Sequence, residues 1–292
     1  MPNEEVTAAG RRISGQVRRT PLLRTEFAGR PVVFKLEQLQ RTGSFKLRGA
    51  LNALLSGELP DAVVTASGGN HGIGVATAAR ILGLPATVYV PESVPDGKAK
   101  RIEAAGARLV RAGDRYADAA AMARSAATTP GVRYLEAYDD PAVIAGQGTV
   151  AAEIVLDAPE VDALVASVGG GGLAAGTALA ADGRKVVAVE PEGCRCLHDA
   201  LAAGEPVDSP VDSVASSALG ASRIGRVPFE VLTDHHVHSV LVTDDQIIAA
   251  QNLLWDEFRL TVEPAAALPF AAFVADLIPA TNPALILCGA NT

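Results

Sequence analysis

The chain has 292 residues, of which 49% are hydrophobic and 20% charged, as is usual for a soluble globular protein with one large or two modest cores. Its 25 basic and 33 acidic residues give a net charge of −8, and no segment concentrates basic residues, so we expect no nucleic-acid partner. The apolar runs are too short to span a membrane, and the N-terminal residues MPNEEVTAAGRRIS lack the apolar core of a signal peptide. The three cysteines make no disulfide framework, so we expect a reduced, cytoplasmic protein with no membrane partner.

The middle of the chain alternates short apolar runs, typical of buried strands, with helical patterns. The sequence predicts, in order, a strand at Ala62–Ala66, a helix through Arg80, a strand at Ala86–Val90, a helix at Lys98–Ala105, a strand at Arg108–Arg111, a helix at Tyr116–Ala127 and a strand at Arg133–Ala137. There follow a long helix at Asp140–Leu156, a strand at Ala163–Val168, an alanine-rich helix and a strand at Lys185–Val189.

Strands separated by helices form βαβ units, so we predict an α/β fold with parallel-rich sheets flanked by helices. The long helix at Asp140–Leu156 interrupts the alternation. We therefore predict two domains: a large one formed by residues 1–58 and 141–292, and a smaller α/β domain, residues 59–140, inserted into it.

A run of four glycines joins a predicted strand to a predicted helix in Ser167-Val168-Gly169-Gly170-Gly171-Gly172-Leu173. Backbone N–H groups at the start of a helix attract anions, and glycines let the backbone approach a phosphate closely. The segment lacks the Gly-Lys-Ser/Thr ending of a P-loop and fits the Rossmann spacing only loosely. By itself the pattern also fits a flexible or tightly packed turn.

Two further segments carry polar side chains at predicted helix starts. In Ser67-Gly68-Gly69-Asn70-His71-Gly72 the Ser, Asn and His side chains are suited to hold a carboxylate or a cofactor oxygen, or simply to cap the helix. In Ser44-Phe45-Lys46-Leu47 the lysine lies between two apolar residues, where desolvation would lower its pKa and make it a nucleophile and base. A solvated charge at a helix end is the ordinary alternative.

The order and spacing of these three segments resemble the fold-type II enzymes that depend on pyridoxal 5′-phosphate (PLP), the tryptophan synthase β-like family. The resemblance is closest to the serine/threonine dehydratases and serine racemases. The segments Asp139–Thr149, Val189-Glu190-Pro191 and Cys288-Gly289-Ala290-Asn291 resemble further blocks of that family. The resemblance extends from about Arg19 to the end of the chain, and it implies PLP as the cofactor and a homodimer as the assembly.

The resemblance also implies which residues bind the cofactor. Lys46, beside Phe45, matches the lysine that forms a Schiff base with PLP, and Asn70 matches the asparagine that bonds the 3′-oxygen of PLP. Gly169–Leu173 matches the loop that binds the phosphate. Cys288 matches the residue that faces the pyridine nitrogen, and a thiol is too weak an acid to keep that nitrogen protonated.

The implied substrate is a small hydroxy amino acid. Lys46 would remove its Cα proton, and the β-hydroxyl would leave as water after taking a proton from the phosphate held at Gly169–Gly172. Hydrolysis would then release a 2-oxo acid and ammonia. Tyr138 would shape the pocket over the substrate side chain. The loop that receives the substrate carboxylate would consist of Ser67, Gly68, Gly69 and His71.

The sequence departs from the family pattern at two informative positions. Gly68 stands where the racemases have a serine acid/base, so we predict elimination rather than racemisation. Cys196 stands six residues after Glu190, where cation-binding members have an acidic residue, so we expect no metal. The segment Val214–Gly225 also departs from the dehydratase pattern, and it would pass near the cofactor.

The leading interpretation is a PLP-dependent serine/threonine dehydratase, that is, an ammonia-lyase. Other reactions of the family stay open, namely serine racemisation, dehydration of 3-hydroxyaspartate and β-replacement. An alternative of another class is a non-catalytic anion- or nucleotide-binding α/β module, in which Lys46 is an ordinary surface charge.

Overall fold

Two sheets form the framework of the protein, whose computed structural model describes residues 3–291. The larger sheet contains, in spatial order, β1 (Leu22–Phe27), β2 (Arg30–Leu36), β10 (Pro283–Leu287), β7 (Ala163–Ser167), β8 (Lys185–Pro191) and β9 (His238–Val242). The smaller sheet contains β5 (Arg108–Arg111), β4 (Ala86–Val90), β3 (Ala62–Ala66) and β6 (Val132–Tyr134). Among these strands only β1 and β2 pair antiparallel, so the predicted α/β fold with parallel-rich sheets is confirmed.

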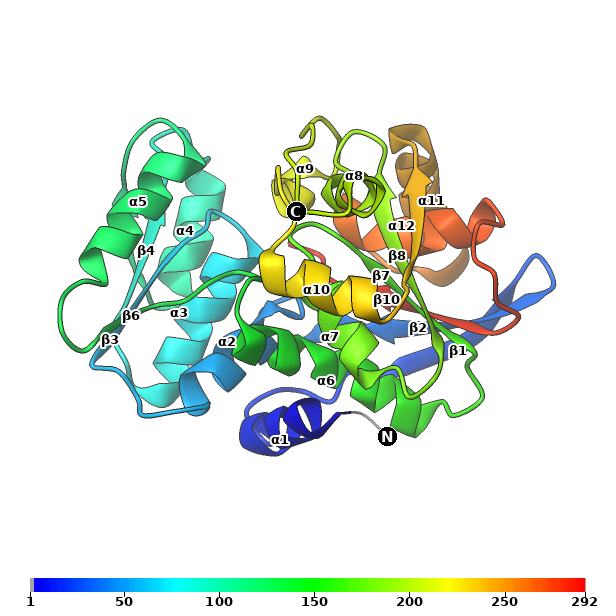
Figure 1. Ribbon diagram of the computed structural model, residues 1–292, viewed down its shortest axis with the longest axis horizontal. Helices are drawn as coiled ribbons and strands as arrows, with labels where there is room; N and C mark the ends of the chain where they lie inside the picture. The colour runs from blue at the N-terminus through cyan, green and yellow to red at the C-terminus, as the bar shows by residue number, and fades with distance from the viewer. Residues whose placement is uncertain (1–2, 292) are drawn as a thin grey trace.

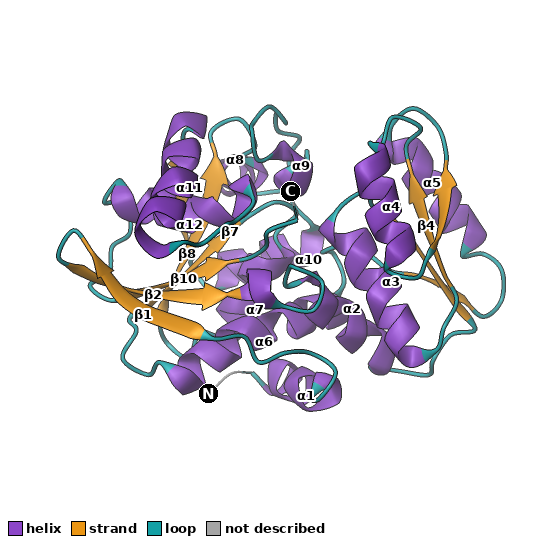
Figure 2. Ribbon diagram, turned by 180° about the vertical axis from the view of Figure 1, so that it is seen from behind, coloured by secondary structure: helices purple, strands orange, loops and turns teal. Residues whose placement is uncertain are grey.

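Helices cover both sheets and fill the space between them. Beside the smaller sheet lie α3 (Asn70–Leu82), α4 (Asp96–Ala104) and α5 (Tyr116–Ala126), which with that sheet form the left lobe in Figure 1. On one face of the larger sheet lie α6 (Pro141–Asp157) and α7 (Gly172–Ala180), and on the other α11 (Asp244–Phe258) and α12 (Pro264–Val274), as Figure 2 shows from behind. The remaining helices are α1 (Glu4–Ile13), the short 3₁₀ helix η1 (Glu37–Leu39), α2 (Lys46–Leu55), α8 (Cys196–Ala203), α9 (Ser216–Leu219) and α10 (Arg226–Asp234).

Most of the predicted helices and strands form where the sequence places them, and two differences concern the end of one strand and a hairpin. The predicted strand Arg133–Ala137 is wrong at its C-terminal end, because β6 ends at Tyr134 and only the N–H of Leu135 still bonds to β3, at Val64. The chain from 135 to 137 thereby runs toward the space between the sheets. The β1–β2 hairpin has no counterpart in the prediction, and it forms one edge of the larger sheet.

The strands of the two sheets come from different stretches of the chain. All the strands of the smaller sheet, together with α3, α4 and α5, fall within residues 59–140. Buried residues form one hydrophobic core around the larger sheet and a second between α2, α3 and the smaller sheet. The domain boundaries themselves stay a prediction.

Glycines allow α2 to lie very close to α6. A Cβ atom added to Gly49 would lie 2.8 Å from the carbonyl oxygen of Val143, and one added to Gly146 would lie 2.7 Å from the carbonyl oxygen of Arg48. A Cβ atom essentially never lies so close to a carbonyl oxygen, so any larger residue at either position would push the helices apart. This contact fixes the position of α2, which begins at Lys46.

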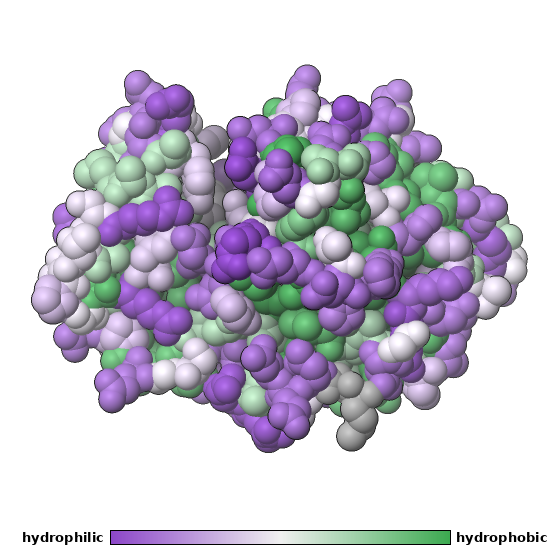
Figure 3. Space-filling view, viewed as in Figure 1, coloured by the Kyte–Doolittle hydropathy of each residue, from purple (hydrophilic) through white to green (hydrophobic). Residues whose placement is uncertain are grey.

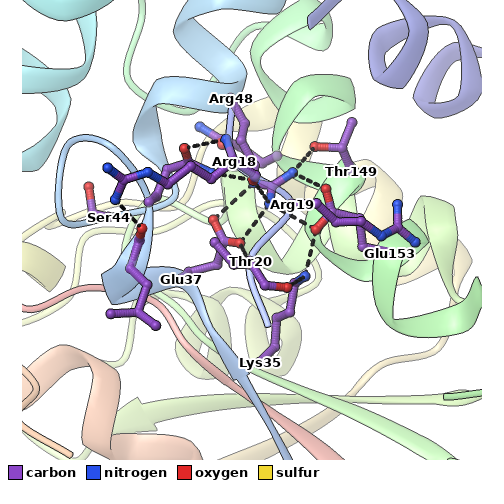
Figure 4. A network of polar contacts seen from close by, with 12 residues as sticks. Arg18, Arg19, Thr20, Lys35, Glu37, Ser44, Arg48, Thr149 and Glu153 are labelled. Carbon is purple, nitrogen blue, oxygen red and sulfur yellow. Dashed lines mark hydrogen bonds and ion pairs between the residues drawn. The ribbon is translucent and has the colours of Figure 1, made fainter. Parts of the chain in front are cut away.

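A buried network of charges holds α2 from its other side (Figure 4). Arg48 is completely buried and donates to Glu37 at 2.7 and 2.9 Å and to Glu153 at 2.7 and 3.0 Å. Lys35 is also completely buried and donates to Glu153 at 2.5 Å and to the carbonyl oxygen of Thr20 at 2.7 Å. Two cations and two anions balance in charge, which is the condition under which buried ions are tolerated. The network therefore ties α2 to β2 and α6.

No helix within residues 3–291 is both long and apolar enough to cross a bilayer. Figure 3 shows hydrophilic side chains over much of the face seen in Figure 1, and a hollow between the left lobe and the rest of the molecule.

Candidate active site

A cleft of about 430 Å³ lies between the two sheets. The loops that follow β3 and β7 contribute to its walls, so the cleft lies at the carboxyl ends of parallel strands, the usual place for ligands in α/β folds. The structure brings to this cleft every residue predicted to bind cofactor or substrate: Phe45, Lys46, Ser67, Gly68, Gly69, Asn70, His71, Tyr138, Gly169, Gly170, Gly171, Gly172, Leu173 and Cys288. The individual roles assigned to these residues stay predictions.

Lys46 is the first residue of α2, and its amine lies in the wall of the cleft. The Nζ atom donates a hydrogen bond to the carbonyl oxygen of Ala137 at 2.9 Å. Burial lowers the pKa of Lys46 from its ordinary value to about 8, although the nearby Glu263 partly opposes this shift. A substantial fraction of the amine is therefore neutral near physiological pH, as a nucleophile or base requires.

Backbone pairing between two distant segments places Cys288 next to Lys46. The N–H of Phe45 donates to the carbonyl oxygen of Cys288 at 3.1 Å, and the N–H of Ala290 donates to that of Gly43 at 2.9 Å. Cys288 is 3% exposed, and burial raises the pKa of its thiol. The thiol is consequently neutral near physiological pH and offers an uncharged partner to any group in the cleft.

The tetraglycine loop between β7 and α7 has no room for side chains. A Cβ atom on Gly170 would overlap the ring of Tyr138, and one on Gly171 would lie 2.6 Å from Ile224. Gly171 also has a φ of +93°, in the left-handed region that glycine favours. Among the described residues, the backbone hydrogen bonds of turns, loops and helix ends include none that is donated by the N–H groups of Gly169–Gly172. Free N–H groups at the start of α7, with no side chain in the way, suit an anion such as the PLP phosphate.

Tyr138 packs against this glycine loop. Its ring lies directly against the Cα atom of Gly170, and its backbone lies against Gly172. Burial raises the pKa of Tyr138 to about 12, so its hydroxyl stays protonated. The expectation that Tyr138 contacts the substrate side chain stays a prediction, since the structure places its ring beside the loop predicted to bind phosphate.

His71 is buried and neutral. Its Nε2 lies 3.2 Å from the carbonyl oxygen of Leu135, which can only accept, so Nε2 carries the proton. The Nδ1 atom has no partner among the described residues. Burial, assisted by the nearby Lys46, lowers the pKa of His71 to about 3. The ring is therefore a poor proton donor near neutral pH and serves as a fixed acceptor.

The loop after β3 is not a simple helix cap. The Oγ of Ser67 accepts a hydrogen bond from the N–H of Gly69 at 3.2 Å, within the loop itself. The N-cap of α3 is Gly69, which has no side chain to accept a bond, and Asn70 is the first residue of the helix. Capping of the helix by Ser67 or Asn70, the ordinary alternative predicted from sequence, is therefore wrong.

Two polar residues that sequence reasoning did not assign to the site form hydrogen bonds with Asn70. Glu263 lines the cleft, is 4% exposed and accepts a hydrogen bond from Asn70 Nδ2 at 2.7 Å. Asn291 donates from its Nδ2 to Asn70 Oδ1 at 2.8 Å. The only available signal for Glu263 was the Glu263-Pro264 pair, which is typical of a helix start and carries no indication of a site. Part of the segment Val214–Gly225, which we expect to pass near the cofactor, lines the cleft, namely residues 216–221.

The residues around Glu190 do not fit a hard divalent cation. The two carboxyl oxygens of Glu190 accept hydrogen bonds from the N–H groups of Leu197 and His198, each at 2.8 Å, so Glu190 satisfies the first turn of α8. Cys196 offers a thiol in place of an oxygen ligand, and this thiol lies 3.2 Å from the carbonyl oxygen of Gly169. Within the described residues no group of three His, Cys, Asp or Glu side chains is arranged for metal binding. A protonated thiol and an engaged carboxyl are poor ligands for Mg²⁺ or Ca²⁺.

Comparison with known proteins agrees with this geometry. The chain matches the family model described as pyridoxal-phosphate dependent enzyme over residues 13–289. It is 36% identical over 285 residues to the L-threonine ammonia-lyase of Geobacter sulfurreducens, a match that covers 94% of this chain and 71% of the relative. It is 35% identical over 314 residues to the serine racemase of Mus musculus, a match that covers 98% of this chain and 90% of the relative. The crystal structure of the T.th. threonine deaminase has a TM-score of 0.93 and 35% sequence identity, and the match covers 100% of this chain and 99% of that one.

Proposed function

Because the chain belongs to the pyridoxal-phosphate dependent enzyme family, we propose that it is an ammonia-lyase, which eliminates water from L-serine or L-threonine. The products would be a 2-oxo acid and ammonia. Relatives of this chain include both an ammonia-lyase and a racemase, so the choice between them depends on the site. The observation that carries the choice is Gly68, which brings no side chain to the cleft wall where a racemase needs a second acid/base.

The residues of the cleft fit PLP. Its phosphate would bind the N–H groups of Gly169–Gly172, Asn70 would bond its ring oxygen, and the neutral thiol of Cys288 would face its ring nitrogen. Lys46 would attach it covalently and, once released by the substrate amine, would accept the Cα proton, which a lowered pKa allows. When bound, PLP withdraws electrons from the substrate Cα and so makes that proton acidic.

The protein would bind and orient the substrate around this chemistry. The loop at Ser67–Gly69 lies at the start of α3, where N–H groups attract a carboxylate. The buried His71 holds this loop against Leu135 and does not itself exchange protons near neutral pH. Lys46 is then the base for the elimination. Gly68 provides no second acid/base on the opposite face.

The test is the release of 2-oxo acid by the purified protein loaded with PLP, with L-serine, L-threonine and L-threo-3-hydroxyaspartate as substrates. We expect 2-oxo acid from L-serine or L-threonine, no activity with Lys46→Ala, and little D-serine. Predominant formation of D-serine would overturn the lyase assignment. A protein that binds no PLP at all would support the non-catalytic anion-binding module.

A second candidate is the dehydration of 3-hydroxyaspartate. Lys98, near the start of α4, also lines the cleft and adds a positive charge to its wall. This charge would favour a substrate with a second carboxylate. A clear preference for 3-hydroxyaspartate in the same panel, lost in Lys98→Met, would select this candidate.

A further inference from the structure

Three side chains from distant parts of the chain form a row of hydrogen bonds, and two of them, Asn70 and Glu263, line the cleft. Asn70 begins α3, Glu263 immediately precedes α12, and Asn291 lies after β10. Asn70 Nδ2 donates to Glu263 Oε1 at 2.7 Å, and Asn291 Nδ2 donates to Asn70 Oδ1 at 2.8 Å. Asn291 also donates from Nδ2 to the carbonyl oxygen of Thr42 at 2.7 Å, and from its backbone N–H to Glu263 Oε2 at 3.2 Å.

The two ends of this row determine the orientation of both amides. A backbone carbonyl such as that of Thr42 can only accept, so Asn291 must present its NH₂ group to it. The second N–H of the same group then faces Asn70, which must present its carbonyl oxygen. The other end of the Asn70 amide faces Glu263, and a carboxylate can only accept, which again requires the NH₂ group there. Both constraints select the same orientation of Asn70.

The fixed orientation leaves Asn70 with one N–H that the row does not use. An amide NH₂ group has two hydrogens, and Glu263 takes one of them. Asn70 lines the cleft that also holds Lys46. We propose that Glu263 and Asn291 are positioning residues, which hold Asn70 so that it offers an N–H to an anionic oxygen of the bound ligand. This inference rests on the proposed function, in which that oxygen is the ring oxygen of PLP.

The surrounding backbone is built to accommodate these side chains. A Cβ atom on Gly289 would lie 2.6 Å from Glu263 Oε1, and one on Gly43 would overlap Asn291 Oδ1. Gly43 also has a φ of +71°. Any other residue at these positions would displace the carboxyl or the amide, so both glycines are needed for the row to form.

Glu263 has to be a carboxylate for the row to work. Two N–H groups, from Asn70 and from the backbone of Asn291, converge on its two oxygens. A glutamine of the same shape has one accepting oxygen and one NH₂ group, so one of the two donors would face another donor. In Glu263→Gln the Asn70 amide should therefore shift or rotate to avoid this contact between two donors. A rotated Asn70 would present its carbonyl oxygen, in place of an N–H, to the oxygen of the ligand.

The experiment compares two ligands in the full-length protein. The dissociation constant of PLP and that of an analogue lacking the ring hydroxyl are measured for wild type, Glu263→Gln and the exposed control Glu92→Gln, with thermal melting as a check on folding. A hydrogen bond to a charged oxygen is worth enough that we expect Glu263→Gln to weaken PLP binding roughly tenfold or more. The analogue should bind Glu263→Gln and wild type equally well, and Glu92→Gln should change neither constant.

A second variant keeps the test decisive if Glu263→Gln folds poorly. Asn291→Asp removes the NH₂ group that faces Asn70 and Thr42, and it should show the same selective loss of PLP affinity. Equal weakening of PLP and of the analogue in both variants, or no weakening in either, would overturn the inference. Failure of the wild type to bind PLP would instead overturn the proposed function, so the two failures are distinguishable.

Discussion

The amine of Lys46 and the carbonyl oxygen of Ala137 lie 2.9 Å apart, and this contact joins the first turn of α2 to the chain that leaves the smaller sheet after β6. A backbone carbonyl accepts a hydrogen bond from the neutral amine as well as from the ammonium ion. The contact therefore holds the amine in place in the wall of the cleft without requiring it to be charged.

The lowered pKa of Lys46 predicts how covalent attachment of PLP depends on pH. Only the neutral amine attacks an aldehyde, so the attachment rate should be half-maximal near pH 8, the pKa of Lys46, and level off at higher pH. An ordinary lysine, with a pKa of about 10.4, would give a rate still rising well above pH ~9. Stopped-flow absorbance of the cofactor-free protein mixed with PLP measures this profile. Lys46→Ala serves as the blank, and a midpoint close to that of an ordinary lysine would contradict the prediction.

Gly68→Ser should introduce racemisation. In the proposed function a serine at this position supplies the acid/base that the cleft otherwise lacks on the face opposite Lys46. A Cβ atom on Gly68 would lie 3.0 Å from Val94 Cγ2, so the double variant with Val94→Ala gives the serine room. The ratio of D-serine to pyruvate formed from L-serine should increase in the double variant. Gly68→Ala with Val94→Ala is the matched control, and an equal ratio in both would argue against this role.

Gly170→Ala should weaken PLP binding through a steric conflict. The added methyl group would overlap the Tyr138 ring, and overpacking of this kind typically costs about 1–3 kcal/mol. A cost in that range corresponds to an affinity for PLP that falls by roughly fivefold to a hundredfold. Removing the ring in Gly170→Ala with Tyr138→Ala should recover most of the loss. If the double variant binds PLP as weakly as the single one, the packing of Tyr138 does not shape the loop.

Cys196→Asp should create a dependence on divalent cations that we do not expect of the natural chain. The substitution places a second carboxyl near Glu190, and a cation would then relieve their repulsion. A cation present at about 100 times its dissociation constant would raise the free energy of unfolding by about 2.7 kcal/mol. Thermal melting with EDTA and with excess Mg²⁺ measures the difference. We expect no difference for wild type, and a Mg²⁺-dependent rise in Tm for wild type would refute the interpretation of Cys196 and Glu190.

Arg48→Met should destabilise the protein strongly. The substitution leaves Glu37 and Glu153 buried without their main partner, and breaking a buried ion pair in this way typically costs about 3–5 kcal/mol. Arg226→Met removes an exposed ion pair with Glu230, and a pair of that kind contributes less than about 1 kcal/mol. Urea unfolding of the two variants should separate them clearly, and similar midpoints would mean that the network of Figure 4 is energetically minor.

The sequence alone determined the local features of the site. The glycine run at Gly169–Gly172 requires a tight turn before a helix, because only glycine tolerates such close packing and a left-handed φ. The alternation of apolar and helical segments indicated a parallel α/β fold, and parallel strands place their following loops at one edge. These local rules, together with the family resemblance, were sufficient to assign Lys46, Asn70 and Cys288 to one predicted site.

Only the tertiary structure decided which distant groups meet. No local sequence pattern indicates that Glu263 or Ala137 belongs to the site. An acidic residue at a helix start and a residue after a strand do not reveal which distant residues pack against them. Their partners, Asn70 and Lys46, are 193 and 91 residues away in the chain. The same holds for the thiol of Cys196, which contacts Gly169 from the start of α8. Such contacts depend on how helices and loops pack around the two sheets, and they set the orientation and pKa of groups that the sequence could only name.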